Sequence, residues 1–265
     1  MTDKQGQSLA PAVTRAVRVL DILAEAGGAP TSLAEIARGL GAAKSSVLNI
    51  CGVLESGGLI QRRDGGYALG WRTAELGAAY LRSFDVVREF HRLTQDSEVL
   101  RGELVNLGLL AGTDALYLGR HEGTAPLRLS AGVGDRLPAA LTALGGALLG
   151  QLSATDLAAR FRSYSFPRLT ERSTDGLAQL RAKLAADRDR GYALDLGEST
   201  PGVIGVGMPV PPARPGRDPW AVSVSLIVGS GRESEFPADR AATVVRALRD
   251  LARRLTNPMS PAGLT

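Results

Sequence analysis

The stretch Ser32-Leu-Ala-Glu-Ile-Ala-Arg-Gly-Leu-Gly-Ala-Ala-Lys-Ser-Ser-Val-Leu-Asn-Ile50 decides the fold of the first part of this chain. A serine followed three residues later by Glu35 is a capping box, which starts a helix, and Gly39-Leu-Gly41 ends that helix. A second helix is expected from about Lys44, with Val47, Ile50 and Leu54 directed inward and Ser45, Ser46 and Asn49 directed outward. Two short helices joined by a tight turn are typical of a helix-turn-helix, which places its second helix in a DNA major groove.

The residues on either side extend this motif. Helical periodicity predicts a preceding helix over residues 14–26, with Val17, Leu20, Leu23 and Ala24 on one face. After the motif, Gly57-Gly58 ends the helix, and residues 59–63, a turn at 64–66 and residues 67–69 form a predicted hairpin. The pattern predicts a winged helix-turn-helix over residues 13–70. The alternative is a winged-helix sensor or adaptor module that dimerises without binding DNA.

Basic and polar side chains of this module are the expected DNA contacts. Lys44, Arg62 and Arg63 lie where phosphates would be, at the start of the recognition helix and on the wing. Asn49 is placed to pair with adenine, or else to contact only a phosphate. The net charge of +4 is not concentrated in this half of the chain. The candidate DNA-binding residues are Arg15, Lys44, Ser45, Ser46, Asn49, Arg62 and Arg63.

Composition limits the other possibilities. A length of 265 residues suits two modest domains. The chain has no secretory leader and no apolar run long enough to span a membrane, so we expect a cytoplasmic protein without membrane contact. A single cysteine, Cys51, agrees with a reducing compartment. Two histidines and one cysteine cannot supply a conventional zinc site, so neither a metal nor a cofactor is expected.

The rest of the chain divides into four further segments. Residues 1–12 are expected to be a flexible arm and residues 257–265 a flexible tail. Residues 71–85 are expected to form a linker helix, whose apolar stripe of Leu76, Tyr80 and Phe84 needs a partner. We therefore expect a homodimer or a homotetramer. Residues 86–256 are left for a second domain.

Alternating helical and period-two patterns give that second domain its predicted class. Helices are expected at about 86–100, 139–152, 177–190 and 237–255, and strands at 103–110, 115–118, 127–130, 203–210 and 220–228. Helices interspersed with antiparallel-looking strands indicate an α+β domain with helices packed on an antiparallel sheet.

The whole of residues 14–255 resembles the IclR family of bacterial transcriptional regulators. The resemblance rests on ordered segments: residues 15–23, 32–37 and 44–47, then 138–145, then 190–195 leading into 201–203 and 209–210, and finally 221–225. It implies an N-terminal winged helix, a linker helix and a C-terminal effector domain. It also implies oligomers that bind pseudo-palindromic operators and respond to small metabolites, without metals or cofactors.

Several positions depart from the family pattern. Ala42-Ala43 replace Leu-Pro before the recognition helix, and Asn49 replaces arginine. In the effector domain, Ala140 and Gly146 replace histidine and lysine, and Gly205 replaces a cysteine that contacts carboxylate ligands in family members. Gly205 therefore indicates a larger or more apolar pocket, or else only a close-packing position.

The resemblance and strand geometry together predict the effector pocket. Ser223 and Ser225 lie two residues apart and so share one face of a strand. Because Asp195 opposes a fully anionic ligand, we expect a ligand with a hydroxyl or amino group beside any carboxylate. The candidate ligand-binding residues are Leu129, Thr142, Ala143, Leu144, Gly145, Asp195, Gly205, Ser223 and Ser225.

Catalysis is not indicated. The chain has no G-x-S-x-G or G-x-x-x-x-G-K-[ST] motif. A winged-helix methyltransferase would need a glycine-rich cofactor loop after a parallel strand, and none is found. The sequence therefore predicts a ligand-responsive DNA-binding regulator, expected to be a repressor, rather than an enzyme.

Overall fold

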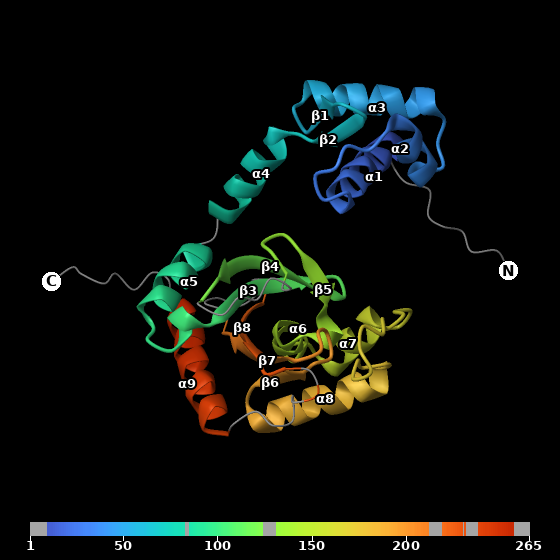
Figure 1. The fold of residues 1–265 in the computed structure, drawn as a ribbon. Coiled ribbons are helices and arrows are strands. Elements are labelled where there is room, and N and C mark those ends of the chain that lie inside the picture. The colour runs from blue at the N-terminus through green and yellow to red at the C-terminus, as the bar shows by residue number, and fades with distance from the viewer. Residues whose placement is uncertain are drawn as a thin grey trace. The chain divides into compact units, whose positions relative to one another are not determined.

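The structure is a computed structural model that describes residues 10–82, 85–123, 131–211, 219–229, 231 and 238–256 (Figure 1). Its contacts divide the chain into a first unit, Met1–Ser83, and a second unit, Phe84–Thr265. Each unit is described by itself. Among the described helices, none is both long enough and apolar enough to cross a membrane.

The first unit is a winged helix followed by one more helix. It comprises α1 (Pro11–Glu25), α2 (Leu33–Leu40), α3 (Lys44–Ser56), β1 (Ile60–Arg63), β2 (Gly66–Leu69) and α4 (Trp71–Arg82). The strands β1 and β2 form an antiparallel hairpin. A bridge between Thr31 and Tyr67 ties the wing to the loop before α2.

The predicted helix signals act as expected. The Ser32 hydroxyl accepts a hydrogen bond from the Glu35 backbone N–H, and the Glu35 carboxylate accepts one from the Ser32 backbone N–H at 2.9 Å. Gly41 ends α2 in the left-handed conformation, with φ of 58°, which costs little without a Cβ. The turn delivers the chain to Lys44, where α3 begins as predicted.

The first helix differs from its prediction in two ways. It starts at Pro11, so the predicted arm of residues 1–12 extends too far into the helix; proline is well suited to the first helical turn because its fixed φ is already helical. Its buried residues are Val19 and Leu23. Val17 is 53% exposed and Ala24 is exposed, so these two predicted face residues were wrong. The apolar stripe that packs is rotated by about one residue.

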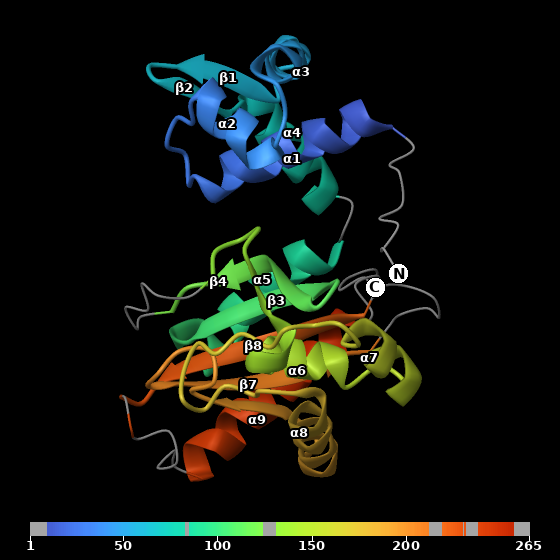
Figure 2. The ribbon, with the colours of Figure 1, turned by 90° about the vertical axis from the view of Figure 1, so that its right-hand side faces the viewer.

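The second unit is a six-stranded antiparallel sheet with helices on both faces (Figure 2). The strand order is β5 (Arg136–Pro138), β4 (Asp114–His121), β3 (Leu104–Ala111), β8 (Trp220–Ile227), β7 (Val203–Val210) and β6 (Ala193–Leu196). The helices are α5 (Asp85–Asp96), α6 (Ala143–Leu149), α7 (Ala154–Arg160), α8 (Leu177–Arg190) and α9 (Ala238–Leu255), with short 3-10 turns η1 (Leu100–Gly102) and η2 (Ala139–Leu141).

The two faces of the sheet bury separate cores. On one face, α5 and α9 pack on a cluster that includes Val105, Val206 and Val224. On the other face, α6 packs against β3, β7 and β8, and α8 lies against β6. Residues two apart on a strand share a face. Asn106, Gly205 and Ser223 therefore lie on the α6 side, where the candidate site is built.

Some elements of the second unit differ from their predictions. The elements β5, α7 and β6 were not predicted. The helix expected over residues 139–152 is η2 followed by α6, because Thr142 is extended and caps α6 instead of continuing a helix. The strand expected at 127–130, Phe84 and the tail at 257–265 lie outside the described residues. The α+β class with an antiparallel sheet is confirmed.

Candidate functional site

The register of the sheet places polar side chains and glycines on one face. Asn106 pairs with Ser223, which pairs with Gly207 across the next strand. In the adjacent row, Ser225 pairs with Gly205, which pairs with Asp195. Neighbouring strands lie about 4.8 Å apart. The two rows therefore form a polar floor under the site. Its polar side chains come from β3, β8 and β6, and β7, which lies between β8 and β6, contributes the backbone of its glycines.

Helix α6 covers this floor closely because the glycines lack side chains. A Cβ on Gly207 would run into the backbone carbonyl of Ala143, and a Cβ on Gly205 would lie 2.8 Å from the Ala143 Cβ. Real Cβ atoms essentially never approach each other this closely. The close-packing interpretation of Gly205 is therefore supported over the one in which glycine enlarges the pocket.

A cavity of about 50 Å³ lies between the floor and the η2–α6 segment. Its described lining is polar on the sheet side and largely apolar opposite. The lining residues are Asn106, Tyr117, Ala131, Leu137, Thr142, Ala143, Leu144, Asp195, Ser199, Thr200, Val203, Gly205, Ser223 and Ser225.

The structure brings most of the predicted pocket residues together. Thr142, Ala143, Leu144, Asp195, Gly205, Ser223 and Ser225 line the cavity. Gly145 does not line it, since its missing Cβ points into the backbone of Ala139 and its N–H donates to the Thr142 hydroxyl at 3.0 Å. This hydrogen bond caps α6. Leu129 lies outside the described residues.

Sequence reasoning missed the residues contributed by β3 and β4 and by the loop after β6. Asn106 is a polar residue inside an otherwise apolar strand, and that contrast was a usable signal. Tyr117 reaches the site only through the pairing of β3 with β4. Its hydroxyl bonds to Thr142, and burial raises the pKa of Tyr117, so it remains a neutral phenol. Ser199 and Thr200 carry no local pattern.

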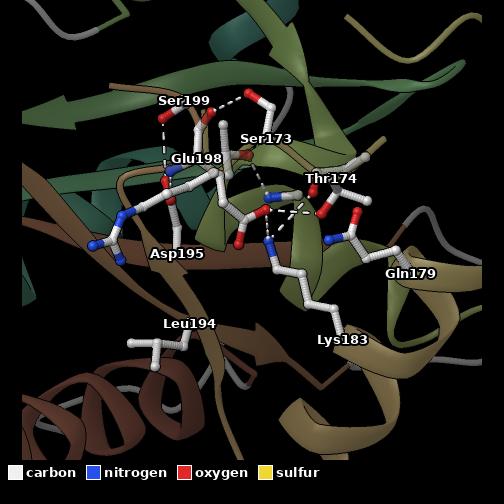
Figure 3. A network of polar contacts seen from close by, with 12 residues as sticks. Ser173, Thr174, Gln179, Lys183, Leu194, Asp195, Glu198 and Ser199 are labelled. Atoms are coloured by element: carbon white, nitrogen blue, oxygen red, sulfur yellow. Dashed lines mark hydrogen bonds and ion pairs between the residues drawn. The ribbon is translucent and has the colours of Figure 1, made fainter. Parts of the chain in front are cut away.

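Asp195 is a carboxyl group at the cavity. Burial disfavours its charged form, and neighbouring groups partly offset that effect. Burial raises the pKa of Asp195 to about 6, while nearby Lys183 and two hydrogen bonds act in the opposite direction. Its Oδ1 accepts from the Glu198 backbone N–H at 2.7 Å, and its Oδ2 accepts from the Ser199 hydroxyl at 3.1 Å (Figure 3). Above pH 6 this group is therefore chiefly an acceptor.

A buried ion pair holds the loop beside Asp195. The Lys183 ammonium lies 2.6 Å from the Glu198 carboxylate, and the two side chains are only 12% and 13% exposed. Lys183 also donates to the Ala140 carbonyl, and Thr174 donates to the same Glu198 oxygen (Figure 3). The pair thereby connects α8, η2 and the loop that carries Ser199.

The candidate DNA-contacting residues occupy the exposed face of α3 and the wing. Lys44, Ser45 and Asn49 are exposed, and Ser46 is half-buried. Arg62 of β1 connects the wing to α3. It forms an ion pair of 3.4 Å with Glu55 of α3, and its guanidinium lies 5.1 Å from the centre of the Tyr67 ring. Arg63 and Arg15 are exposed, the latter on α1.

Two family models together match nearly the whole chain. The IclR helix-turn-helix domain matches residues 12–64, and the C-terminal domain of the bacterial transcriptional regulator IclR matches residues 78–257. The second match alone covers more than half of the 265 residues.

Individual relatives agree with these matches. The chain is 32% identical over 201 residues to a probable transcriptional regulator, SauR, of Cupriavidus necator, covering 75% of this chain and 79% of the relative. It is 26% identical over 259 residues to the transcriptional repressor AllR of Klebsiella pneumoniae, covering 97% and 93%. An IclR homologue of Microbacterium hydrocarbonoxydans, solved with 4-hydroxybenzoate, has a TM-score of 0.75 at 21% identity, covering 94% and 98%.

Proposed function

The chain belongs to the IclR family of bacterial transcriptional regulators, and we propose that it represses an operator until a small metabolite enters the cavity of its second unit. The observation that carries this proposal is the exposed polar face of α3 within a winged helix. A ligand in the cavity changes operator affinity through the coupling of two sites. The name of the repressor AllR supports repression over activation.

We assign residues 13–70 to DNA binding, 71–85 to the linker helix and 86–256 to effector sensing. The DNA-binding residues are those predicted on α1, α3 and the wing, with Arg62 also bracing the wing against α3. The relatives are regulators by name, which favours DNA binding over the adaptor alternative and over a methyltransferase. The site of action is the cytoplasm, where bacterial operator DNA is found.

Oligomerisation through α4 is the next part of the proposal. Within the single chain α4 has no buried residue, and Trp71, Leu76 and Tyr80 are 64%, 50% and 45% exposed. Exposed apolar stripes of this kind mark interaction surfaces. The purified chain is expected to sediment as a dimer or larger species at micromolar concentration, and Leu76→Glu with Tyr80→Glu to shift it towards monomer. If the wild-type chain sediments as a monomer instead, a dimer does not bind the two halves of a pseudo-palindromic operator.

Asn49→Ala is expected to remove discrimination at one base pair of the operator. A duplex selected from a random library by the wild-type chain serves as the specific site, and a scrambled duplex as the reference. Because a bidentate asparagine–adenine contact discriminates by about 1–3 kcal/mol, the variant should lose that much affinity for the selected duplex only. Equal losses on both duplexes would show that Asn49 contacts phosphate alone.

Arg63→Ala is the matched control in the same titrations. A phosphate contact is independent of sequence, so this variant should weaken binding to both duplexes alike. It should also flatten the slope of log affinity against log salt by about one unit. If neither duplex is bound with a salt-dependent affinity by the wild-type chain, the adaptor alternative replaces the proposed function.

A further inference from the structure

The cavity contains a buried acceptor that the fold leaves unsatisfied. Asn106 is 2% exposed, and its Oδ1 has no hydrogen-bond partner among the described residues. Buried polar atoms are nearly always paired, so an exception calls for an explanation. Asn106 lines the cavity, and the missing partner can therefore be supplied from inside it. This inference rests on the proposed function and concerns the ligand of the same site.

The residues around Asn106 are suited to a ligand that donates hydrogen bonds. Ser223, its partner in the sheet register, and Ser225 in the next row also line the cavity. Asp195 contributes a further acceptor, because a carboxylate has about four lone-pair sites and the fold fills two of them. Asn106 on β3 and Asp195 on β6 are therefore two acceptors at opposite sides of the cavity lining.

The charge of the site acts against a plain carboxylate. Of the described side chains that line the cavity, Asp195 is the charged one. Arg120, paired with Asn106 through β4, is held by Glu122 and by the carbonyl of Ala131, and it is not among those lining residues. A carboxylate group would place a like charge near Asp195 and could not itself donate to Asn106.

We propose that Asn106 is an effector-binding residue that accepts a hydrogen bond from the ligand, and that the effector is a small neutral molecule with an amide N–H or hydroxyl donor. The donor group lies against the Asn106 Oδ1, with the hydroxyls of Ser223 and Ser225 as adaptable partners and Asp195, on the far strand β6, free to accept from a second donor of the same ligand. A cavity of about 50 Å³ limits the ligand to a few non-hydrogen atoms in this state of the protein.

Matched carboxamide and carboxylate probes test the ligand class. Glycolamide and glycolate share a hydroxyl, as do lactamide and lactate, and the members of each pair differ in one group: a neutral amide that can donate, against a charged carboxylate that cannot. Calorimetric titration of the full chain, without DNA, is expected to give at least about tenfold tighter binding of each carboxamide. Carboxylates that bind as tightly as or more tightly than their carboxamides overturn the proposal. Because no DNA is present, failure to bind an operator cannot be mistaken for this result.

Variants of Asn106 test the residue itself. Asn106→Asp keeps an acceptor and should retain carboxamide binding within about threefold, whereas Asn106→Leu should weaken carboxamide binding at least about tenfold. Loss of carboxamide binding in Asn106→Asp would mean that the native amide acts as a donor, against the proposal.

The stability of the ligand-free protein gives a readout that depends on no probe. A buried acceptor kept for a ligand costs the free protein stability, so Asn106→Leu should raise the melting temperature. Thr94 is the matched control: its Oγ1 is likewise buried without a described partner, but it lies on α5 away from the cavity lining. Thr94→Val should raise the melting temperature without changing ligand binding. If no probe binds and Asn106→Leu lowers the melting temperature, Asn106 is structural and the proposal is wrong.

Discussion

Lys183→Met is expected to destabilise the second unit by about 3–5 kcal/mol, because it leaves the Glu198 carboxylate buried without its cation. The ammonium lies 2.6 Å from that carboxylate, and both side chains are almost fully buried. Methionine matches the length of the lysine stem but cannot supply the charge or donate to the Ala140 carbonyl. The loop that carries Ser199 should therefore lose its anchor.

Urea denaturation of the full chain can measure the free energy of unfolding of the second unit separately from that of the first. The chain has two tryptophans, Trp71 in the first unit and Trp220 in the second. In a Trp71→Phe background, the fluorescence of Trp220 reports on the second unit alone. The double variant Lys183→Met with Glu198→Gln should recover most of the loss, since neither charge is then buried unpaired.

An exposed ion pair with a similar N–O distance serves as a control, because it shows whether burial or the short distance makes the Lys183–Glu198 pair important for stability. Arg92 lies 2.8 Å from Glu89, but its side chain is 49% exposed. Arg92→Met should cost no more than about 1 kcal/mol, because solvent screens an exposed pair. If Lys183→Met and Arg92→Met reduce the free energy of unfolding equally, the buried Lys183–Glu198 pair does not anchor the loop and the cavity wall.

Gly207→Ala is expected to destabilise the second unit by about 3 kcal/mol and to weaken ligand binding with it. The new methyl group would run into the backbone carbonyl of Ala143, which cannot rotate away as a side chain could. Either α6 lifts from β7 or the strand bends, and both responses cost packing. Since α6 and β7 enclose the cavity from two sides, its shape changes in either case.

Gly102→Ala provides the control for the same measurement. Gly102 lies in the same unit, and a Cβ built on it meets nothing within 4 Å. This variant should change the free energy of unfolding by no more than about 0.5 kcal/mol. A Gly207→Ala protein as stable as Gly102→Ala would show that the close approach of α6 to the sheet is not required.

The elements that could be predicted are those with strong local signals. The capping box at Ser32, the glycine at position 41 and the start at Lys44 all depend on contacts within a few residues, and each lies where it was expected. The strand over residues 203–210 and the helix over residues 177–190 also match, since Gly191 ends that helix with a left-handed φ of 81°. Local chemistry was sufficient at these positions.

The prediction failed where burial depends on a distant partner. Val17 and Ala24 of α1 fit a helical stripe with the correctly predicted Leu23, and only packing against α2 and α3 buries Val19 in their place. The short strands β5 and β6 have three and four residues. Such strands are formed by pairing with β4 and β7 rather than by their own pattern.

The sequence by itself determined the winged helix and the α+β class of the second unit, because these follow from capping, periodicity and the two-residue repeat of a strand, while the family resemblance indicated part of the cavity lining. Only the tertiary structure decided which residues meet across strands. Asn106 joins Ser223 through strand register, and Lys183 reaches Glu198 from another element. It also decided that Gly205 is a close-packing position, since α6 and β7 are separated by more than fifty residues of chain and their approach is a property of the assembled core.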